Sequence, residues 1–390
     1  MRFQFSSCCS VLLILASSSY ADTTQPSTKK TTAPQQSTPK AQPANTSYPI
    51  DLSQFNKKNF YFSLEGLYGT ISDGGITGTA YAQTIQANGQ VNNVQTPSGS
   101  NFGYAITLAY KLTPDALKAL TARYMSLNTT GKSNTGVGTT GFMYNELTQV
   151  SDPLNGGAFL LSGPASASSQ NTFDYQNIDL MVVRPWDDAG FANMTFTKSV
   201  GLRLTYLTKG LTGQYTGFIQ NNNPGTVYTT DNVDYSADYY GIGPQIGVTG
   251  MLQLMPSVKA KGGGLAAFLA GYYHSNLNET MNAAQPINIQ LPGGGGGQSI
   301  TSSTFASNEN HPAQAWTPLI FEADFSVQVD LIKHPNHQND LSLESGVSTE
   351  YLLPTFSNDS YFSTLGQDLP KLNNNLTLVN VFLKLNYNLD

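Results

Sequence analysis

Three carboxylates share one side of an eleven-residue stretch, FEADFSVQVDL, at residues 321–331. Glu322, Asp324 and Asp330 stand at even positions with other polar residues, whereas every odd position is apolar. A period of two puts the two sets on opposite faces of a β-strand. A row of carboxylates favours cations when it lines a polar lumen. In a soluble sheet the same row would only be a solvated face, so the rest of the chain must decide between these interpretations.

Catalytic chemistry is weakly supported by the residues available for it. A hydrolytic nucleophile needs a base such as histidine, and the chain has only His274, His311, His334 and His337. His274 lies near the loop end of a predicted strand, where a Ser–His site would fit, but a lone histidine there is more often a polar rim residue. We therefore predict that the protein is not an enzyme.

Metal and cofactor motifs are incomplete. The HPNH stretch at 334–337 has a metal-ligand spacing only on a helix, and Pro335 breaks one. The acidic stretch at 231–240 lacks the full ligand pattern of a calcium loop. The glycine run 293–297 has no Lys-Ser/Thr pair after it, so it is no phosphate cradle. We predict no cofactor and no metal.

The first 21 residues have the features of an export signal. Arg2 gives a positive start, residues 11–16 (VLLILA) form a short apolar run, and small residues stand before a cut after Ala21. The run is too short to span a bilayer as a helix. Both cysteines lie in this segment, so no disulfide framework is expected in the exported chain.

The remaining composition excludes some partners. Residues 22–58 are rich in Thr, Pro and Gln, so we predict a disordered arm before a domain at 59–390. A formal net charge of −6 with 11% charged residues argues against nucleic acid. No later stretch approaches the roughly 20 apolar residues of a membrane helix. A membrane location would therefore require a closed β-barrel.

Amphipathic runs recur regularly and predict about ten antiparallel strands (8–12). They lie near residues 59–70, 102–112, 117–127, 173–184, 194–208, 234–254, 264–276, 317–331, 340–353 and 375–387. The connections alternate in length, with long loops expected at 71–101, 128–172, 209–233, 277–316 and 354–374 and short turns between them. Long extracellular loops and short periplasmic turns are typical of outer-membrane barrels. The predicted fold class is therefore an all-β, antiparallel transmembrane β-barrel.

Within such a barrel the apolar faces meet lipid and the polar faces meet the lumen. The predicted lumen-lining residues are Glu65, Arg123, Asp179, Arg203, Glu322, Asp324, Asp330, Glu344, Glu350 and Lys384. Carboxylates outnumber cations in this set, which predicts a mild preference for cations. Alternatively the charges pair across the barrel as a structural plug, for example Arg203 with Asp179, and the barrel is closed.

Several sequence segments resemble the Legionella major outer membrane protein family of pore-forming proteins. They are VGLRLTYLTKG at 200–210, YYGIGPQIGVTG at 239–250, LSLESGVSTEYL at 341–352 and NVFLKLNY at 380–387, and the most distinctive is the GxGPxxG pattern from Gly241 to Gly247. The resemblance covers roughly residues 59–388. It implies a β-barrel in a Gram-negative outer membrane that passes small solutes. The chain departs from the usual aromatic last residue by ending Tyr387-Asn388-Leu389-Asp390.

Two functions are therefore expected. The first is porin-like passive diffusion of small solutes or ions through a narrow, mildly acidic lumen. The alternative is a surface-exposed structural barrel or adhesin whose loops bind host or envelope partners. The expected partners are outer-membrane lipid and lipopolysaccharide, the barrel assembly machinery and small solutes or ions, with host surface molecules added in the alternative. The expected location is the cell outer membrane.

Overall fold

The computed structural model describes residues 60–73, 80–112, 118–145, 147, 160–186, 194–220, 226–290, 296–332, 339–353 and 375–389. All of them belong to a compact unit that spans Ala44–Asp390. The predicted signal segment and arm lie outside the described residues, as do His334 and His337.

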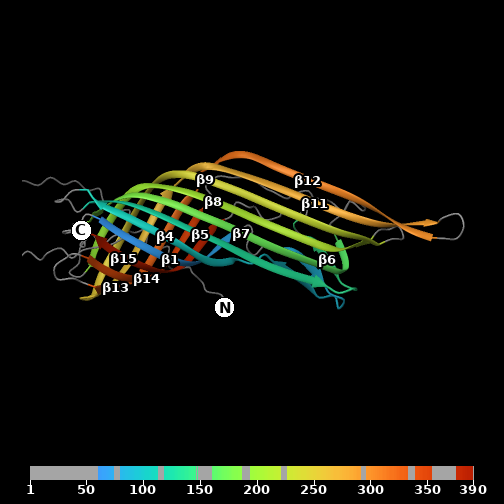
Figure 1. Cartoon of the computed structure of the whole chain (residues 1–390), viewed down its shortest axis with the longest axis horizontal. Coiled ribbons are helices and arrows are strands. Elements are labelled where there is room, and N and C mark those ends of the chain that lie inside the picture. The colour runs from blue at the N-terminus through green and yellow to red at the C-terminus, as the bar shows by residue number, and fades with distance from the viewer. Residues whose placement is uncertain are drawn as a thin grey trace, which may run out of the picture. The chain divides into compact units, whose positions relative to one another are not determined.

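The described residues form strands and no helix (Figure 1). The strands are β1 (Phe60–Asp73), β2 (Ala80–Ile85), β3 (Val91–Gln95), β4 (Gly99–Lys111), β5 (Ala119–Val137), β6 (Phe142–Asn145), β7 (Leu160–Pro185), β8 (Met194–Gln220), β9 (Thr226–Met255), β10 (Val258–Phe268), β11 (Ala270–Gln290), β12 (Gly296–Trp316), β13 (Leu319–Ile332), β14 (Asn339–Leu353) and β15 (Leu376–Leu389). In this part of the chain, no helix is long and apolar enough to cross a membrane.

Twelve of these strands make a ring of about ten barrel strands. Only Leu269 separates β10 from β11, and only Thr317 and Pro318 separate β12 from β13, so each pair runs on as one barrel strand. Pro318 cannot donate to a ladder, which accounts for the interruption beside it. The ring follows the chain antiparallel from β1 through β4, β5, β7, β8 and β9 to β14 and β15. It closes where β15 pairs with β1, from Leu389 opposite Phe60 to Leu376 opposite Asp73. The prediction of about ten antiparallel strands is confirmed.

The long connections contain much more strand than expected. The segment 128–172 is largely the ends of β5 and β7, and 209–233 is largely the tip of the β8–β9 hairpin. The segment 277–316 is mostly β11 and β12, which pair from Gly271 opposite Trp316 to Gln290 opposite Gly296. These segments are polar and rich in Gly, Asn and Thr, which made them look like loops. They nevertheless keep the alternation of a strand, because one of their faces is buried.

Three short strands in the extension of the barrel continue the same sheet from the start of β7. β2 pairs with β3 and with β6, and β6 pairs with the first residues of β7. Gly89, with a φ of 81°, supplies the left-handed residue of the β2–β3 turn. The inward-facing Tyr215 of β8 donates to the Tyr81 carbonyl at 2.8 Å. Asn145 of β6 donates to Asp231 of β9 at 2.5 Å. Through β2 and β6, this part of the sheet (β2, β3 and β6), called here the inner sheet, contacts the inward faces of β8 and β9.

The outer surface of the ring is banded. Exposed Val, Leu, Ile and Phe side chains form an apolar belt, for example Val200 and Leu202 on β8. Beyond it, on the side of the long connections, lies an aromatic girdle of exposed residues: Tyr68, Phe102, Tyr104, Tyr206, Tyr240, Tyr272, Phe321 and Tyr351. Tyr206, Tyr240 and Tyr272 are opposite one another on β8, β9 and β11. An apolar band with aromatic edges is the exterior of a transmembrane barrel.

Candidate functional site: two charge layers inside the barrel

The first charge layer, called here the arginine layer, consists of Arg123, Arg203, Glu65, Asp179, Glu322 and Glu350. All six side chains are buried inside the ring. Strand register brings part of it together, because Arg123 on β5 is opposite Asp179 on β7, which is opposite Arg203 on β8. Glu322 and Glu350 are opposite each other on β13 and β14. Two like charges in that position repel, so a cation is needed between them.

Arg203 supplies this cation from the far wall of the barrel. Its exposed fraction is 0%. It donates from Nε to Asp179 Oδ1 at 2.7 Å and from Nη2 to Asp179 Oδ2 at 3.1 Å, a two-point contact. Nη2 also donates to Glu322 Oε2 at 2.8 Å, and Nη1 donates to Glu350 Oε1 at 3.4 Å. The Tyr175 hydroxyl donates to the same Glu350 oxygen. Arg203 therefore ties β7 and β8 to β13 and β14 across the lumen.

Arg123 makes a looser second bridge. Its Nη2 lies 3.5 Å from Glu65 Oε1 on β1, and its Nη1 lies 3.8 Å from Glu322 Oε1 on β13. Asp179 Oδ2 is 4.0 Å from Nη1. The layer as a whole holds four carboxylates and two guanidinium groups. Carboxylates are therefore in excess over cations.

The second charge layer, the lysine layer, consists of Lys259, Lys261, Lys384, Glu344 and Asp330. Lys261 Nζ donates to Glu344 Oε2 at 2.8 Å, and Ser326 Oγ donates to Glu344 Oε1 at 2.7 Å. Lys259 Nζ lies 3.7 Å from Asp330 Oδ2. Lys384 on β15 stands in register between Glu65 on β1 and Glu344 on β14. This layer lies inside the ring like the first; it shares β13 and β14 with the arginine layer and adds β10 and β15.

The ten residues predicted to line the lumen all stand on the inward faces of their strands. Eight are buried, and Asp324 and Asp330 are partly exposed. Asp324 reaches inward beside Gly263 of β10, where an added Cβ would come within 2.6 Å of Asp324 Oδ1. Gly263 thus leaves the room that this carboxylate occupies. The alternative in which Arg203 pairs with Asp179 is the arrangement found.

Three residues that contact these charges, Lys259, Lys261 and Tyr175, are not among the lumen-lining residues that the sequence predicts. The runs predicted at 234–254 and 264–276 leave a turn at 255–263 that contains Lys259 and Lys261, but β10 begins at Val258 and the turn itself is Pro256–Ser257. The alternation Val258, Lys259, Ala260, Lys261 was the available signal. Tyr175 was overlooked because it is aromatic, although it shares the even spacing of Asp179 on β7.

The remaining candidates for chemistry stand apart from these layers. His274 is exposed on the outer face, and its Nε2 lies 3.0 Å from Asn310 Oδ1. The acidic stretch 231–240 is part of β9 rather than a loop, with Asp231 turned inward and Asp234 and Asp238 outward. Among the described residues, no group of three or more His, Cys, Asp or Glu is placed to hold a metal ion.

Ion pairs cross the membrane part of the lumen. A ring of ten strands is narrow, and barrels of about eight strands are filled by their own side chains. Here the filling is mixed, since the charged residues lie among buried apolar ones such as Met181, Leu265 and Phe382. Removing one member of a buried ion pair typically costs about 3–5 kcal/mol, whereas an apolar filling of similar volume is often as stable. Stability alone therefore does not account for the charges.

Comparison with known proteins gives no family. No protein-family model and no curated protein matches the chain. Similar solved structures include the outer membrane protease OmpT from Escherichia coli, with 12% identity and a TM-score of 0.36 over 85% of this chain and 96% of that one. They also include the Ralstonia pickettii toluene transporter TbuX, with 9% identity and a TM-score of 0.26 over 86% and 91%. A Pseudomonas aeruginosa FadL homologue gives 8% identity and a TM-score of 0.24 over 85% and 90%. At such values no function follows, and the barrel is established by its own strand register.

Proposed function

We propose that the chain is a porin-like protein of a Gram-negative outer membrane that passes small cations slowly, and that the conformation described here is its closed state. The observation that carries this proposal is that ion pairs cross the lumen and join strands from different sides of the ring. Arg203 and Arg123 contact carboxylates from β1, β7, β13 and β14. Hydrated ions can replace such contacts one at a time, which an apolar plug does not allow.

The membrane location is supported by the outer surface. On β8, Lys198 and the girdle residue Tyr206 are eight positions apart, with Val200, Leu202 and Leu204 facing outward between them. A rise of about 3.3 Å per residue and a tilt of about 40° give a height of roughly 20 Å. That is close to the ~25 Å apolar band of outer-membrane barrels. Lipid, lipopolysaccharide and the barrel assembly machinery are the partners that this location implies.

Preference for cations follows from the excess of carboxylates. The arginine layer has four carboxylates for two guanidinium groups, and Asp324 adds another beside it. Acidic rings select cations in pores. The resemblance to the Legionella major outer membrane protein family agrees with a pore. That membership stays a prediction, because no family model matches.

A second function, a closed structural barrel or adhesin, is favoured by a different observation. Beyond the girdle the barrel extension has a packed interior, in which Tyr81, Tyr215, Tyr235 and Tyr239 are almost fully buried. The inner sheet adds to this packing. In this alternative the long strands present a rigid surface to host or envelope molecules, and the lumen never conducts.

Single-channel recording in planar bilayers separates the two functions. We expect the folded wild-type protein to give rare, small, cation-selective steps. Arg203→Ala should open the lumen and raise the open probability at least several-fold, because the bridge from β8 to β13 and β14 is lost. Lys132→Gln, an exposed change on the outer face of the β5 extension, serves as the control and should behave as wild type. Inserted protein that stays silent in all three forms would contradict the pore and leave the structural barrel. Anion-selective steps would contradict the assigned role of the carboxylates.

A further inference from the structure

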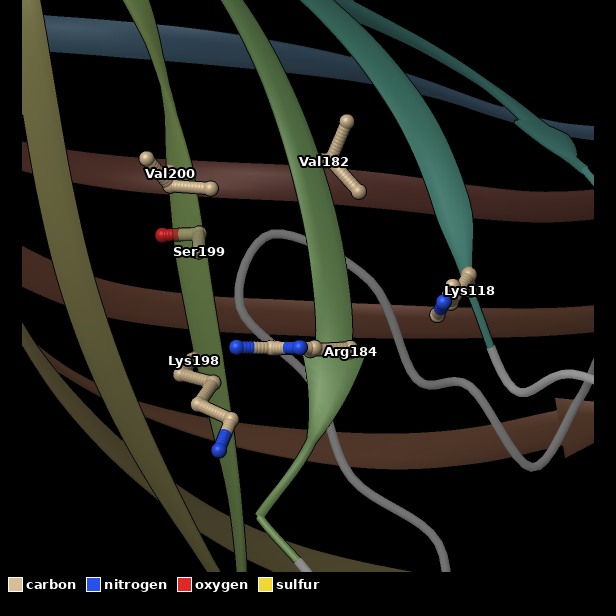
Figure 2. Close-up of a pocket in the computed structure, with 6 residues that line it drawn as sticks. All are labelled: Lys118, Val182, Arg184, Lys198, Ser199 and Val200. Carbon is tan, nitrogen blue, oxygen red and sulfur yellow. The ribbon is translucent and has the colours of Figure 1, made fainter.

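A hollow on the outer face of the barrel lies at the edge of the apolar belt, on the side of the short turns. Its volume is about 280 Å³, and it is lined by Lys118, Val182, Arg184, Lys198, Ser199 and Val200 (Figure 2). The charge layers contain none of these residues. The hollow therefore has no part in closing the lumen.

The register of β5, β7 and β8 brings the three cations of this hollow close together. Arg184 on β7 is opposite Lys198 on β8, and its neighbour Val183 is opposite Ala119, the residue after Lys118. Figure 2 shows Arg184 extending from β7 towards β8, which carries Lys198. Lys118 and Arg184 are exposed, and Lys198 is half-buried. Within the described residues, none of the three lies in an ion pair with a carboxylate.

The residues around the three cations are of the types found at the boundary between a membrane and water. Val182 and Val200 continue from the hollow into the apolar belt. Trp186 is exposed on the other side, and Lys198 Nζ lies 5.7 Å from the centre of its ring. Tryptophan and basic residues are the usual anchors at the level of lipid headgroups. The girdle of Tyr206, Tyr240 and Tyr272 marks the opposite boundary of the belt.

We propose that this hollow, called here the basic rim site, binds the phosphate of an anionic phospholipid in the periplasmic leaflet. The three cations would hold the headgroup, and one acyl chain would lie along Val182 and Val200. A headgroup with two phosphates matches three cations better than one with a single phosphate. The inference rests on the proposed membrane location but not on conduction.

A lipid fits the site better than a free phosphate ion for two reasons. The hollow is only half enclosed, and Lys118 and Arg184 are exposed, so a small ion would remain partly hydrated and be screened by salt. The apolar lining beside the cations would also gain nothing from a small ion, whereas it can bury an acyl chain. Basic pockets at membrane boundaries bind the headgroups of anionic lipids in this way.

Native mass spectrometry of the folded full chain in detergent tests the site, with cardiolipin, phosphatidylglycerol and phosphatidylethanolamine added separately. Each cation near an anionic headgroup is worth about 5-fold in affinity. We therefore expect Lys198→Gln to weaken cardiolipin binding about 5-fold. Changing Lys118, Arg184 and Lys198 together to Gln should weaken it about 100-fold. Lys132→Gln makes the same chemical change on the outer face of the β5 extension, and we expect it to weaken binding less than 2-fold.

Folding and membrane insertion are measured in parallel, so that a failure of the proposed membrane location can be told apart from a failure of the basic rim site. Each variant is checked for the heat-stable folded form by gel mobility, and for insertion by flotation with vesicles of phosphatidylethanolamine and phosphatidylglycerol. A wild-type protein that does not float would contradict the membrane location. A protein that floats but binds phosphatidylethanolamine as tightly as cardiolipin would overturn the basic rim site. Equal loss of cardiolipin in Lys132→Gln, or its displacement by millimolar inorganic phosphate, would overturn it as well.

Discussion

Two parts of strand β8, on either side of the girdle residue Tyr206, can be compared position by position. On the turn side, Val200 and Leu202 face outward while Ser199 and Arg203 are buried inside. Beyond Tyr206 the outward positions are mostly Thr, Gly and Gln, and the buried ones are mostly apolar: Leu207, Leu211, Tyr215 and Ile219, with Lys209 as the charged exception. The alternation keeps its phase through the girdle, but the chemistry of the two faces is exchanged.

The exchange shows that the surroundings, and not the strand, decide which face is apolar. In the belt the outer face meets lipid, so apolar side chains are outside and polar groups must find partners inside. In the extension the outer face meets water, and the apolar side chains pack inside as in a soluble protein. The same exchange occurs on β9, where Ile246 faces outward in the belt and Val233 faces inward beyond it. The molecule is thus a membrane barrel continued by a water-exposed sheet with a core.

The largest expected effect is on the charged interior of the belt. Arg203→Met would leave Asp179, Glu322 and Glu350 buried without their common cation, and we expect a loss of about 3–5 kcal/mol in the free energy of unfolding. Equilibrium denaturant titration of the barrel in micelles, followed by tryptophan fluorescence, measures this loss. Lys209→Met is the matched variant in the extension, where the lysine makes a buried pair with Asp73 at 2.5 Å. Because Lys209 has fewer charged partners, its loss should be smaller, and an equal or greater loss would contradict this comparison.

The exchange of polarity along β8 can be tested directly with one charge placed at two heights. Leu202→Arg puts the charge in the belt, where an arginine facing lipid costs about 2–4 kcal/mol. Thr212→Arg puts it on the same outward face beyond the girdle, where a surface change is usually within about 0.5 kcal/mol. Unfolding of the two variants in lipid vesicles gives both values. Equal costs would mean that the girdle does not mark a membrane boundary.

A buried carboxyl pair in the extension makes stability depend on pH. Asp231 lies about nine positions beyond Tyr240 on β9, outside the belt, and burial followed by the nearby Glu279 raises its pKa from 3.8 to about 8. The folded state therefore keeps a proton that the unfolded chain releases. This contribution to stability is complete below pH ~4 and is lost as the pH rises to about 8, with a slope of up to about 1.4 kcal/mol per pH unit.

Asp231→Asn should flatten this slope between pH 5 and pH 8 and should make the extension more stable at the upper end. Asp234→Asn, an exposed change on the same strand, is the control and should keep the wild-type slope. Denaturant midpoints at a series of pH values give the slopes. An unchanged slope in Asp231→Asn would show that another group binds the proton.

The smallest effect concerns the attachment of the inner sheet. Tyr215→Phe removes the donor to the Tyr81 carbonyl and should cost about 0.5–1.5 kcal/mol, because that carbonyl stays buried. Tyr124→Phe removes a more exposed bond to Gln176 at 3.2 Å and should be near neutral. Hydrogen exchange of the β2 amides would show whether the loss is local. Unchanged protection of β2 in Tyr215→Phe would argue against this attachment.

The strands of the belt could be predicted because lipid and lumen impose a strict period of two. All ten predicted runs correspond to barrel strands, and each predicted lumen charge stands on an inward face. The extensions were mistaken for loops because their inward residues include Gly, Thr and Ala as well as Leu and Tyr. The alternation of apolar and polar residues in these segments is therefore weak, because small and polar residues occur on both faces. The pattern does not indicate Lys259 and Lys261, because the sequence predicts a turn of nine residues where the chain turns within two.

By itself, the sequence determined the number of barrel strands, the face of each charge and the sorting of short and long connections. These follow from local alternation and from turn residues, which depend on near neighbours along the chain. The tertiary structure alone decided that Arg203 meets Glu322 and Glu350, that the inner sheet contacts β8 and β9, and that Lys118, Arg184 and Lys198 share one hollow. Those contacts depend on ring closure and on the register of distant strands, which the packing of the whole barrel sets.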